Sequence, residues 1–126
     1  MKVKLAVAGA LVLLLAAPAF GASIAGRYTG VVLGKTPASL NGQWELDFDA
    51  TGAYTIMKEG KKMVTGKAKV AAGTITFADT GGPAKCPKPG KYKWSLKGGL
   101  SLTFKAVGDT CANRKTVLTA GTYFKQ

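Results

Sequence analysis

The chain has 126 residues, and its 18 Lys and Arg against 6 Asp and Glu give a formal net charge of +12. This length suits one small domain and is too short for two domains with separate cores. The chain contains no histidine, the commonest general base near neutral pH and the commonest metal ligand. The composition therefore argues against an enzyme and favours a binding or structural protein.

The first residues have the three-part pattern of a secretory signal peptide. Lys2 and Lys4 give a positively charged start, residues 5–17 form an apolar run, and small residues follow that run. The run is too short to cross a bilayer comfortably. We expect a signal peptide at residues 1–21 and a single domain at residues 22–126, exported to the periplasm or to the extracellular medium.

Eight later segments show the alternation of apolar and polar residues that is typical of β-strands. They cover residues 27–33, 43–49, 53–58, 62–70, 74–78, 91–97, 100–106 and 115–124. No segment after the signal peptide is expected to be helical. Strands at such regular intervals, joined mainly by short turns, predict an all-β fold. We expect an eight-stranded antiparallel up-and-down barrel, because closure removes exposed strand edges, and a β-sandwich is the alternative.

The clearest hairpin lies at residues 91–106. Gly98 and Gly99 are expected to supply the positive φ angles that a two-residue turn requires. Alternation then predicts which side chains of the two strands point to the interior. These inward residues are Tyr92, Trp94, Leu96, Leu100, Leu102, Phe104 and Ala106.

The only two cysteines, Cys86 and Cys111, lie just outside the two ends of this hairpin. Antiparallel pairing brings those ends together, so the geometry of the hairpin favours a disulfide bond. An exported protein also meets an oxidising compartment, which supports the same pairing. A crosslink that closes a loop of this length contributes roughly 3 kcal/mol to stability.

Large aromatic residues occupy many of the positions that alternation turns inward. An eight-stranded barrel is just wide enough to be filled by its own side chains or to hold one small ligand. An apolar lining with a few polar groups is typical of a site for a small molecule. The candidate ligand-binding residues of the barrel interior are Tyr28, Trp44, Tyr54, Tyr92, Trp94 and Phe104.

Three short motifs resemble bacterial lipocalin-like proteins of the calycin type. They are G-R-Y-T-G at residues 26–30, G-Q-W at residues 42–44 and D-T-C-A-N-R at residues 109–114. Members of this group are exported small barrels that typically bind apolar ligands, with a Gly-x-Trp motif on the first strand and an Arg across the Trp ring. The resemblance implies that Tyr28 takes the place of that Trp and that Arg114, a structural residue, stacks on it. The Gly-x-Trp of this chain departs from the pattern, because it lies on the second expected strand.

The remaining polar residues give little support for catalysis. Pairing of both cysteines removes a thiolate nucleophile and a zinc site together. Glu45, Asp47 and Asp49 are expected on the outward face of one strand, and Asp109 is expected to cap a turn. We therefore expect no enzyme activity, no metal and no cofactor.

These observations predict an exported lipocalin-like binding protein for a small apolar or amphipathic ligand. Two alternatives stay open. In one, the barrel is filled and binds a protein partner, for instance as a secreted protease inhibitor that presents the long loop at residues 79–89. In the other, the lysines make weak contact with an anionic envelope surface. We expect a monomer and no specific nucleic-acid partner.

Overall fold

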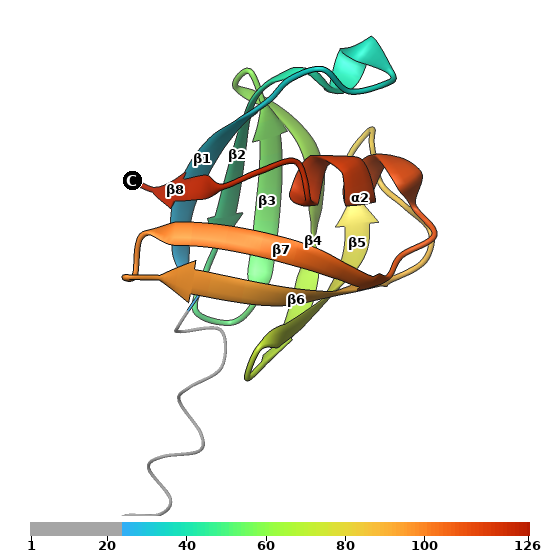
Figure 1. The fold of residues 1–126 in the computed structure, drawn as a ribbon. Helices are drawn as coiled ribbons and strands as arrows, with labels where there is room; N and C mark the ends of the chain where they lie inside the picture. Colours follow the sequence, from blue (N-terminus) through green and yellow to red (C-terminus); the bar gives the residue numbers. More distant parts are fainter. Residues whose placement is uncertain (1–23) are drawn as a thin grey trace, which may run out of the picture.

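The structure of the chain, a computed structural model, describes residues 24–126, and the expected signal peptide lies outside the described residues. Eight antiparallel strands follow one another around a closed barrel, and β8 returns to pair with β1 (Figure 1). The strands are β1 Gly26–Val32, β2 Gly42–Phe48, β3 Ala53–Lys58, β4 Lys61–Ala71, β5 Thr74–Gly81, β6 Gly90–Lys97, β7 Ser101–Gly108 and β8 Tyr123–Lys125. The predicted eight-stranded up-and-down barrel is confirmed, and the alternative β-sandwich is wrong.

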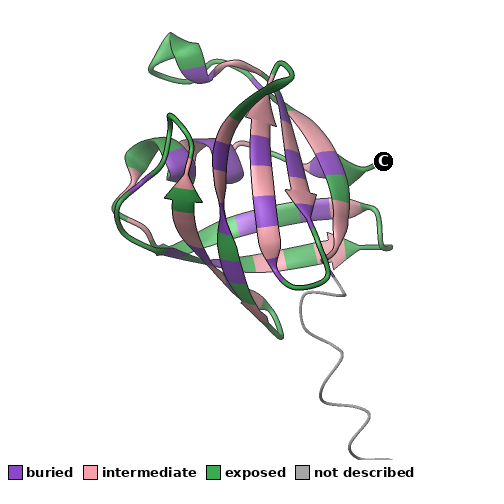
Figure 2. Cartoon of the chain, turned by 180° about the vertical axis from the view of Figure 1, so that it is seen from behind, coloured by how far each residue is buried: buried purple, intermediate pink, exposed green. Residues whose placement is uncertain are grey.

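Buried and more exposed residues alternate along the strands, as the sequence pattern predicts (Figure 2). In β2, the side chains of Trp44, Leu46 and Phe48 are buried. On the outer face of the same strand, Asp47 forms an ion pair with Arg27 of β1 at 3.6 Å. Alternation in this strand therefore separates a core face from a solvated face.

The β6–β7 hairpin turns at Gly98 and Gly99, whose φ angles of 62° and 73° confirm the predicted turn. The ends of the return strand differ from the prediction. Leu100 lies in the turn and is 59% exposed, and Ala106 is exposed near an irregularity in the β6–β7 register at Tyr92. The prediction that Leu100 and Ala106 belong to the core was wrong.

The segment predicted as a long final strand, residues 115–124, instead contains the end of a helix, a turn and only the first two residues of a strand. Helix α2 covers Ala112–Leu118, and β8 is limited to Tyr123–Lys125. The buried residues of α2 lie at the i, i+3 and i+4 spacing of a single helix face; they are Arg114, Val117 and Leu118. The expectation of no helix was therefore wrong. No helix in the described part of the chain is long and apolar enough to span a membrane.

Six aromatic side chains fill much of the barrel interior. Their neighbouring ring centroids lie 5.2 to 6.3 Å apart, mostly in edge-to-face or tilted arrangements. Such geometries add to the stabilisation that burial of the rings already provides. We call this group the aromatic core; it comprises Tyr28, Phe48, Tyr54, Phe77, Tyr92 and Phe104. Space remains at one end of the barrel, beyond these rings.

Candidate functional site

A cavity of about 500 Å³ opens at the end of the barrel that carries α2, and we call it the mouth cavity. The β1–β2 loop, the β3–β4 turn, the β5–β6 loop and α2 surround this end of the barrel (Figure 1). Most of its wall is apolar. The apolar side chains that form the wall include Leu40, Trp44, Ile56, Val64, Val117 and Leu118.

Hydrogen bonds from two aromatic side chains, Trp44 and Tyr123, fix two parts of this wall. The short 3-10 helix η2, Ala38–Leu40, places Leu40 over the barrel, and the Trp44 Nε1 donates a hydrogen bond to the Leu40 carbonyl at 2.8 Å. The Tyr123 hydroxyl donates to the Val117 carbonyl at 2.5 Å and so ties α2 to the start of β8. The cavity wall is therefore held in place by buried polar contacts.

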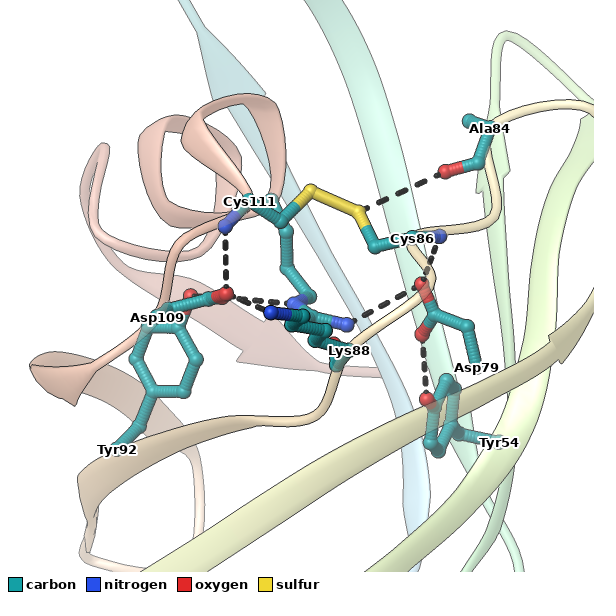
Figure 3. Close-up of a disulfide and its surroundings, with 9 residues drawn as sticks. Tyr54, Asp79, Ala84, Cys86, Lys88, Tyr92, Asp109 and Cys111 are labelled. Atoms are coloured by element: carbon teal, nitrogen blue, oxygen red, sulfur yellow. Dashed lines mark hydrogen bonds and ion pairs between the residues drawn. A yellow bond between two sulfur atoms is a disulfide. The ribbon is translucent and has the colours of Figure 1, made fainter.

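The predicted disulfide joins Cys86 and Cys111, whose Cα atoms lie 6.2 Å apart (Figure 3). Cys86 lies in the β5–β6 loop, and Cys111 directly precedes α2. Both cysteines line the mouth cavity. The disulfide therefore connects two walls of the cavity, as well as closing a loop of the chain.

Arg114 lines the mouth cavity and pairs with two buried carboxylates, those of Asp79 and Asp109, which Figure 3 shows beside the disulfide. Its Nε lies 2.7 Å from Asp109 Oδ2 and its Nη2 lies 2.8 Å from Asp109 Oδ1, a bidentate pair. The Nη2 also donates to the Lys88 carbonyl at 2.6 Å, and the Nη1 lies 3.2 Å from Asp79 Oδ2. The three charged side chains are at most 5% exposed. We call this group the polar floor; it comprises Tyr54, Asp79, Tyr92, Asp109 and Arg114.

Two tyrosines of the aromatic core complete the polar floor. The Tyr54 hydroxyl donates to Asp79 Oδ1 at 2.6 Å, and the Tyr92 hydroxyl donates to Asp109 Oδ2. Burial, together with the neighbouring carboxylate, raises the pKa of each tyrosine hydroxyl. Both hydroxyls therefore remain protonated donors, and they connect the aromatic core to the buried carboxylates of Asp79 and Asp109.

The charges of the polar floor stabilise one another. Burial alone would raise the pKa of Asp109, but hydrogen bonds from Arg114, Tyr92 and the Cys111 backbone outweigh it and lower the pKa. Burial likewise opposes the charge on Arg114, yet its pairing with Asp109 and Asp79 raises its pKa. One guanidinium thus faces two carboxylates, which leaves the cluster with one excess negative charge.

The predicted ligand-binding residues occupy three different environments. Tyr28, Tyr54, Tyr92 and Phe104 belong to the aromatic core, and only Trp44 lines the mouth cavity. Trp94 is partly buried beside the β4–β5 turn, at the opposite end of the barrel, where its Nε1 donates to the carbonyls of Ala71 and Thr74 at 3.2 and 3.1 Å. The cavity therefore uses a different set of residues from the one that alternation suggested.

The expected stacking of Arg114 on Tyr28 is replaced by ion pairing. The Arg114 guanidinium is engaged by carboxylates, whereas the Tyr28 ring packs edge-on against Phe48 with centroids 6.2 Å apart. The Tyr28 hydroxyl donates to the Ile24 carbonyl at 2.9 Å. Asp109 does accept from the Cys111 backbone at 2.9 Å, as a turn-capping residue should, but its larger role is to bind the arginine.

Sequence reasoning missed the cavity residues Val117 and Leu118 and the buried role of Asp79. The spacing of the helix face would have found the first two. Asp79 follows Phe77 by two positions, so alternation places its carboxylate inside the barrel, where a charge requires a partner. Arg114 was the candidate cation, because the resemblance already placed it near the barrel interior.

In residues 24–126, no group of three or more His, Cys, Asp and Glu side chains is placed to hold a metal ion. No family model, curated protein or solved structure matches the chain. The closed eight-stranded antiparallel barrel agrees with the fold that the lipocalin-like motifs imply.

Proposed function

We propose that this chain is an exported lipocalin-like binding protein that takes a small apolar or amphipathic molecule into the mouth cavity. The observation that carries the proposal is a cavity of about 500 Å³ with mostly apolar walls, which opens at one end of the barrel. This volume lies within the range of roughly 300–1,000 Å³ that is usual for ligand sites. Burial of apolar surface, at about 25 cal/mol per Å², would drive binding.

The disulfide supports export as part of the proposal. Disulfide bonds form and persist in oxidising compartments, and this one joins two walls of the cavity. We propose that the protein works in the periplasm or the medium after removal of residues 1–21.

Native mass spectrometry of the exported protein, before and after extraction with organic solvent, tests the proposal. We expect an excess mass that extraction removes. A protein that carries no molecule and also fails to bind any apolar probe after extraction would contradict the proposal.

Tryptophan fluorescence locates the binding site. The Trp94→Phe variant keeps Trp44 in the cavity wall, so its emission should change as an apolar probe binds. The matched Trp44→Phe variant keeps Trp94 at the opposite end of the barrel, and its emission should stay constant. The reverse pattern would place the ligand elsewhere.

A second candidate function, contact with an anionic polysaccharide of the envelope, is supported by the distribution of charge. Six lysines project from the outer face of β4, β6 and β7, whose sequences contain no acidic residue. Lys93 lies directly opposite Lys105 in the β6–β7 register, an arrangement that costs stability. We call these six lysines the basic face; they are Lys67, Lys69, Lys91, Lys93, Lys97 and Lys105.

Retention on immobilised dextran sulfate tests this second candidate. Elution should require salt, because contact between exposed charges is screened as ionic strength rises. The double variant Lys93→Glu/Lys105→Glu should elute at much lower salt than Lys35→Glu/Lys115→Glu, which changes the net charge equally at the mouth end of the barrel. Equal effects of the two double variants would show that net charge alone causes retention.

A further inference from the structure

Lys58 places a positive charge on the inner face of the barrel, where β3 reaches the mouth cavity. Tyr54 and Ile56 are the buried side chains of β3, and alternation puts Lys58 on the same face. The β2–β3 register agrees, because Lys58 lies opposite Trp44, whose side chain is buried in the cavity wall. Lysine is rare on the core face of a strand, since a charge that is partly removed from water requires a partner.

A second lysine, Lys85, lines the cavity from the β5–β6 loop. The Ala84 backbone N–H donates to the Met63 carbonyl of β4 at 3.0 Å, which holds this loop against the strand that neighbours β3. Gly82 allows the close approach, because a Cβ at this position would overlap with the Met63 carbonyl. Lys58 and Lys85 therefore reach the cavity from neighbouring parts of its wall.

No carboxylate of the described residues forms an ion pair with either lysine. Among the described residues that line the cavity, only Asp79 is acidic, and its side chain is 1% exposed. Its carboxylate already accepts hydrogen bonds from the Tyr54 hydroxyl and the Cys86 backbone, and it pairs with Arg114. The charges of the polar floor thus compensate one another, and those of the two lysines stay uncompensated.

Glu59 follows Lys58 in the chain, but its carboxylate is used elsewhere. This exposed residue accepts a hydrogen bond from the Gln43 backbone N–H, which lies 2.7 Å from its Oε2. A cleft that is lined by uncompensated charge of one sign attracts ligands of the opposite sign. The mouth cavity therefore combines an apolar wall with a site for a negative charge.

We infer that the ligand of the mouth cavity is an amphiphile with one anionic group, which pairs with Lys58 and Lys85 while its apolar body lies in the cavity. This inference rests on the proposed function, that the cavity takes a small apolar or amphipathic molecule. Residues such as Leu40 and Val117 pack around the apolar body. The two ammonium groups set its orientation, because the anion binds on the side of the wall where they lie.

Three probes that share the same two rings test the inference with the solvent-extracted protein. Benzophenone is uncharged, 4-benzoylbenzoate adds a carboxylate, and (4-benzoylbenzyl)trimethylammonium adds a positive charge. In titrations followed by NMR at low salt, we expect 4-benzoylbenzoate to bind more tightly than the cation by about tenfold, a ratio equivalent to about 1.4 kcal/mol. Added salt should weaken the binding of 4-benzoylbenzoate and leave that of benzophenone unchanged.

A pair of double variants locates the charge that the anion meets. Lys58→Gln/Lys85→Gln should lower the affinity for 4-benzoylbenzoate by about tenfold and leave that for benzophenone within about twofold, because the apolar wall is kept. The control Lys61→Gln/Lys62→Gln removes the same net charge at the start of β4, outside the cavity wall. It should change the affinity for 4-benzoylbenzoate by less than about twofold, since exposed charges at a distance are screened.

The other outcomes separate this inference from the proposed function. If benzophenone binds and the two double variants weaken 4-benzoylbenzoate equally, net charge alone attracts the anion and the assigned pairing is wrong. If Lys58→Gln/Lys85→Gln loses benzophenone as well, the lysines support the shape of the cavity instead of binding a charged group. Tightest binding of the cation would also overturn the inference. If none of the three probes binds, the proposed function itself is contradicted.

Discussion

Asp109 connects more of the barrel interior than any other carboxylate of the polar floor. Its side chain is fully buried and accepts hydrogen bonds from Arg114, from the Tyr92 hydroxyl and from the Cys111 backbone. Gly90, at the start of β6, lies against this carboxylate, and a Cβ at Gly90 would overlap with it. Asp109, which makes the bidentate pair with the arginine, therefore needs the absence of a side chain at Gly90.

The substitution Asp109→Asn should lower the free energy of unfolding by about 3 kcal/mol, because it removes one charge from a buried ion pair and leaves the arginine less compensated. Urea denaturation at neutral pH measures the change. The control is Asp47→Asn on the outer face, whose partly exposed ion pair with Arg27 at 3.6 Å should be worth about 0–1 kcal/mol. Similar losses for the two variants would contradict the assigned role of Asp109.

The stabilising role of the Asp109 charge should also be visible in the pH dependence of stability. The pKa of Asp109 is lower in the folded protein than its usual value of about 3.9, so its contribution is fully present above that value. The contribution is lost as pH falls through the folded pKa. Between pH 5 and pH 2, the stability of Asp109→Asn should therefore decline less steeply than that of the parent protein. Parallel declines would show that Asp109 titrates normally.

Gly90, the first residue of β6, and Gly108, the last residue of β7, form a matched pair for a test of packing. Gly90→Ala places a methyl group on the Asp109 carboxylate, and such overpacking should cost about 1–3 kcal/mol. Gly108→Ala meets no atom within 4 Å, so its effect should stay within about 0.5 kcal/mol. Thermal or urea denaturation compares the two variants. If the two variants lost the same amount of stability, the contact between Gly90 and the Asp109 carboxylate would not limit packing at this position.

At the scale of elements, the disulfide and α2 should act together on stability and on binding. The double variant Cys86→Ala/Cys111→Ala should lose about 3 kcal/mol, because the bond closes a loop with a sequence separation of 25. It should also bind an apolar probe more weakly, since two walls of the mouth cavity are no longer joined. Denaturation and probe titration at low temperature, where the variant is folded, measure both effects. Unchanged affinity would separate the disulfide from the site.

The strands could be predicted from the sequence, but α2 could not be assigned with the same rule. Alternation identified β2 and the β6–β7 hairpin because those strands bury one face and expose the other. In α2 only seven residues are helical, and Thr116 and Val117 are types that favour strands. A helix this short is stabilised by tertiary packing, here of Val117 and Leu118 on the barrel mouth, which a local pattern does not contain.

The candidate site was predictable only in part, for a related reason. Alternation indicates which side chains point inward, and it did so for Trp44 and Tyr54. It does not indicate where along the barrel the interior is filled and where it is open. That depends on how the aromatic rings meet in three dimensions and on loops such as η2, which places Leu40 over the opening.

At the scale of the whole molecule, the very short strand β8 closes the barrel. Phe124 lies opposite Thr29 of β1 on one side and Ser101 of β7 on the other. Removal of residues 123–126 should leave the edges of β1 and β7 unpaired, and such edges promote association. Size-exclusion chromatography with light scattering should detect oligomers or aggregates of this truncated protein. Removal of Gln126 alone should cause no association, and an unassociated 123–126 truncation would contradict the role of β8.

The measurement that tests the central claim most directly is a titration of the ¹⁵N-labelled, solvent-extracted protein with benzophenone, followed by amide chemical shifts. The account predicts saturable one-to-one binding, with the largest shifts around the mouth cavity at Leu40, Val64 and Val117. Amides of the basic face, such as those of Lys93 and Lys105, should remain unchanged. Shifts that do not saturate, or that lie mainly on the outer face of β6 and β7, would contradict the mouth cavity as the ligand site.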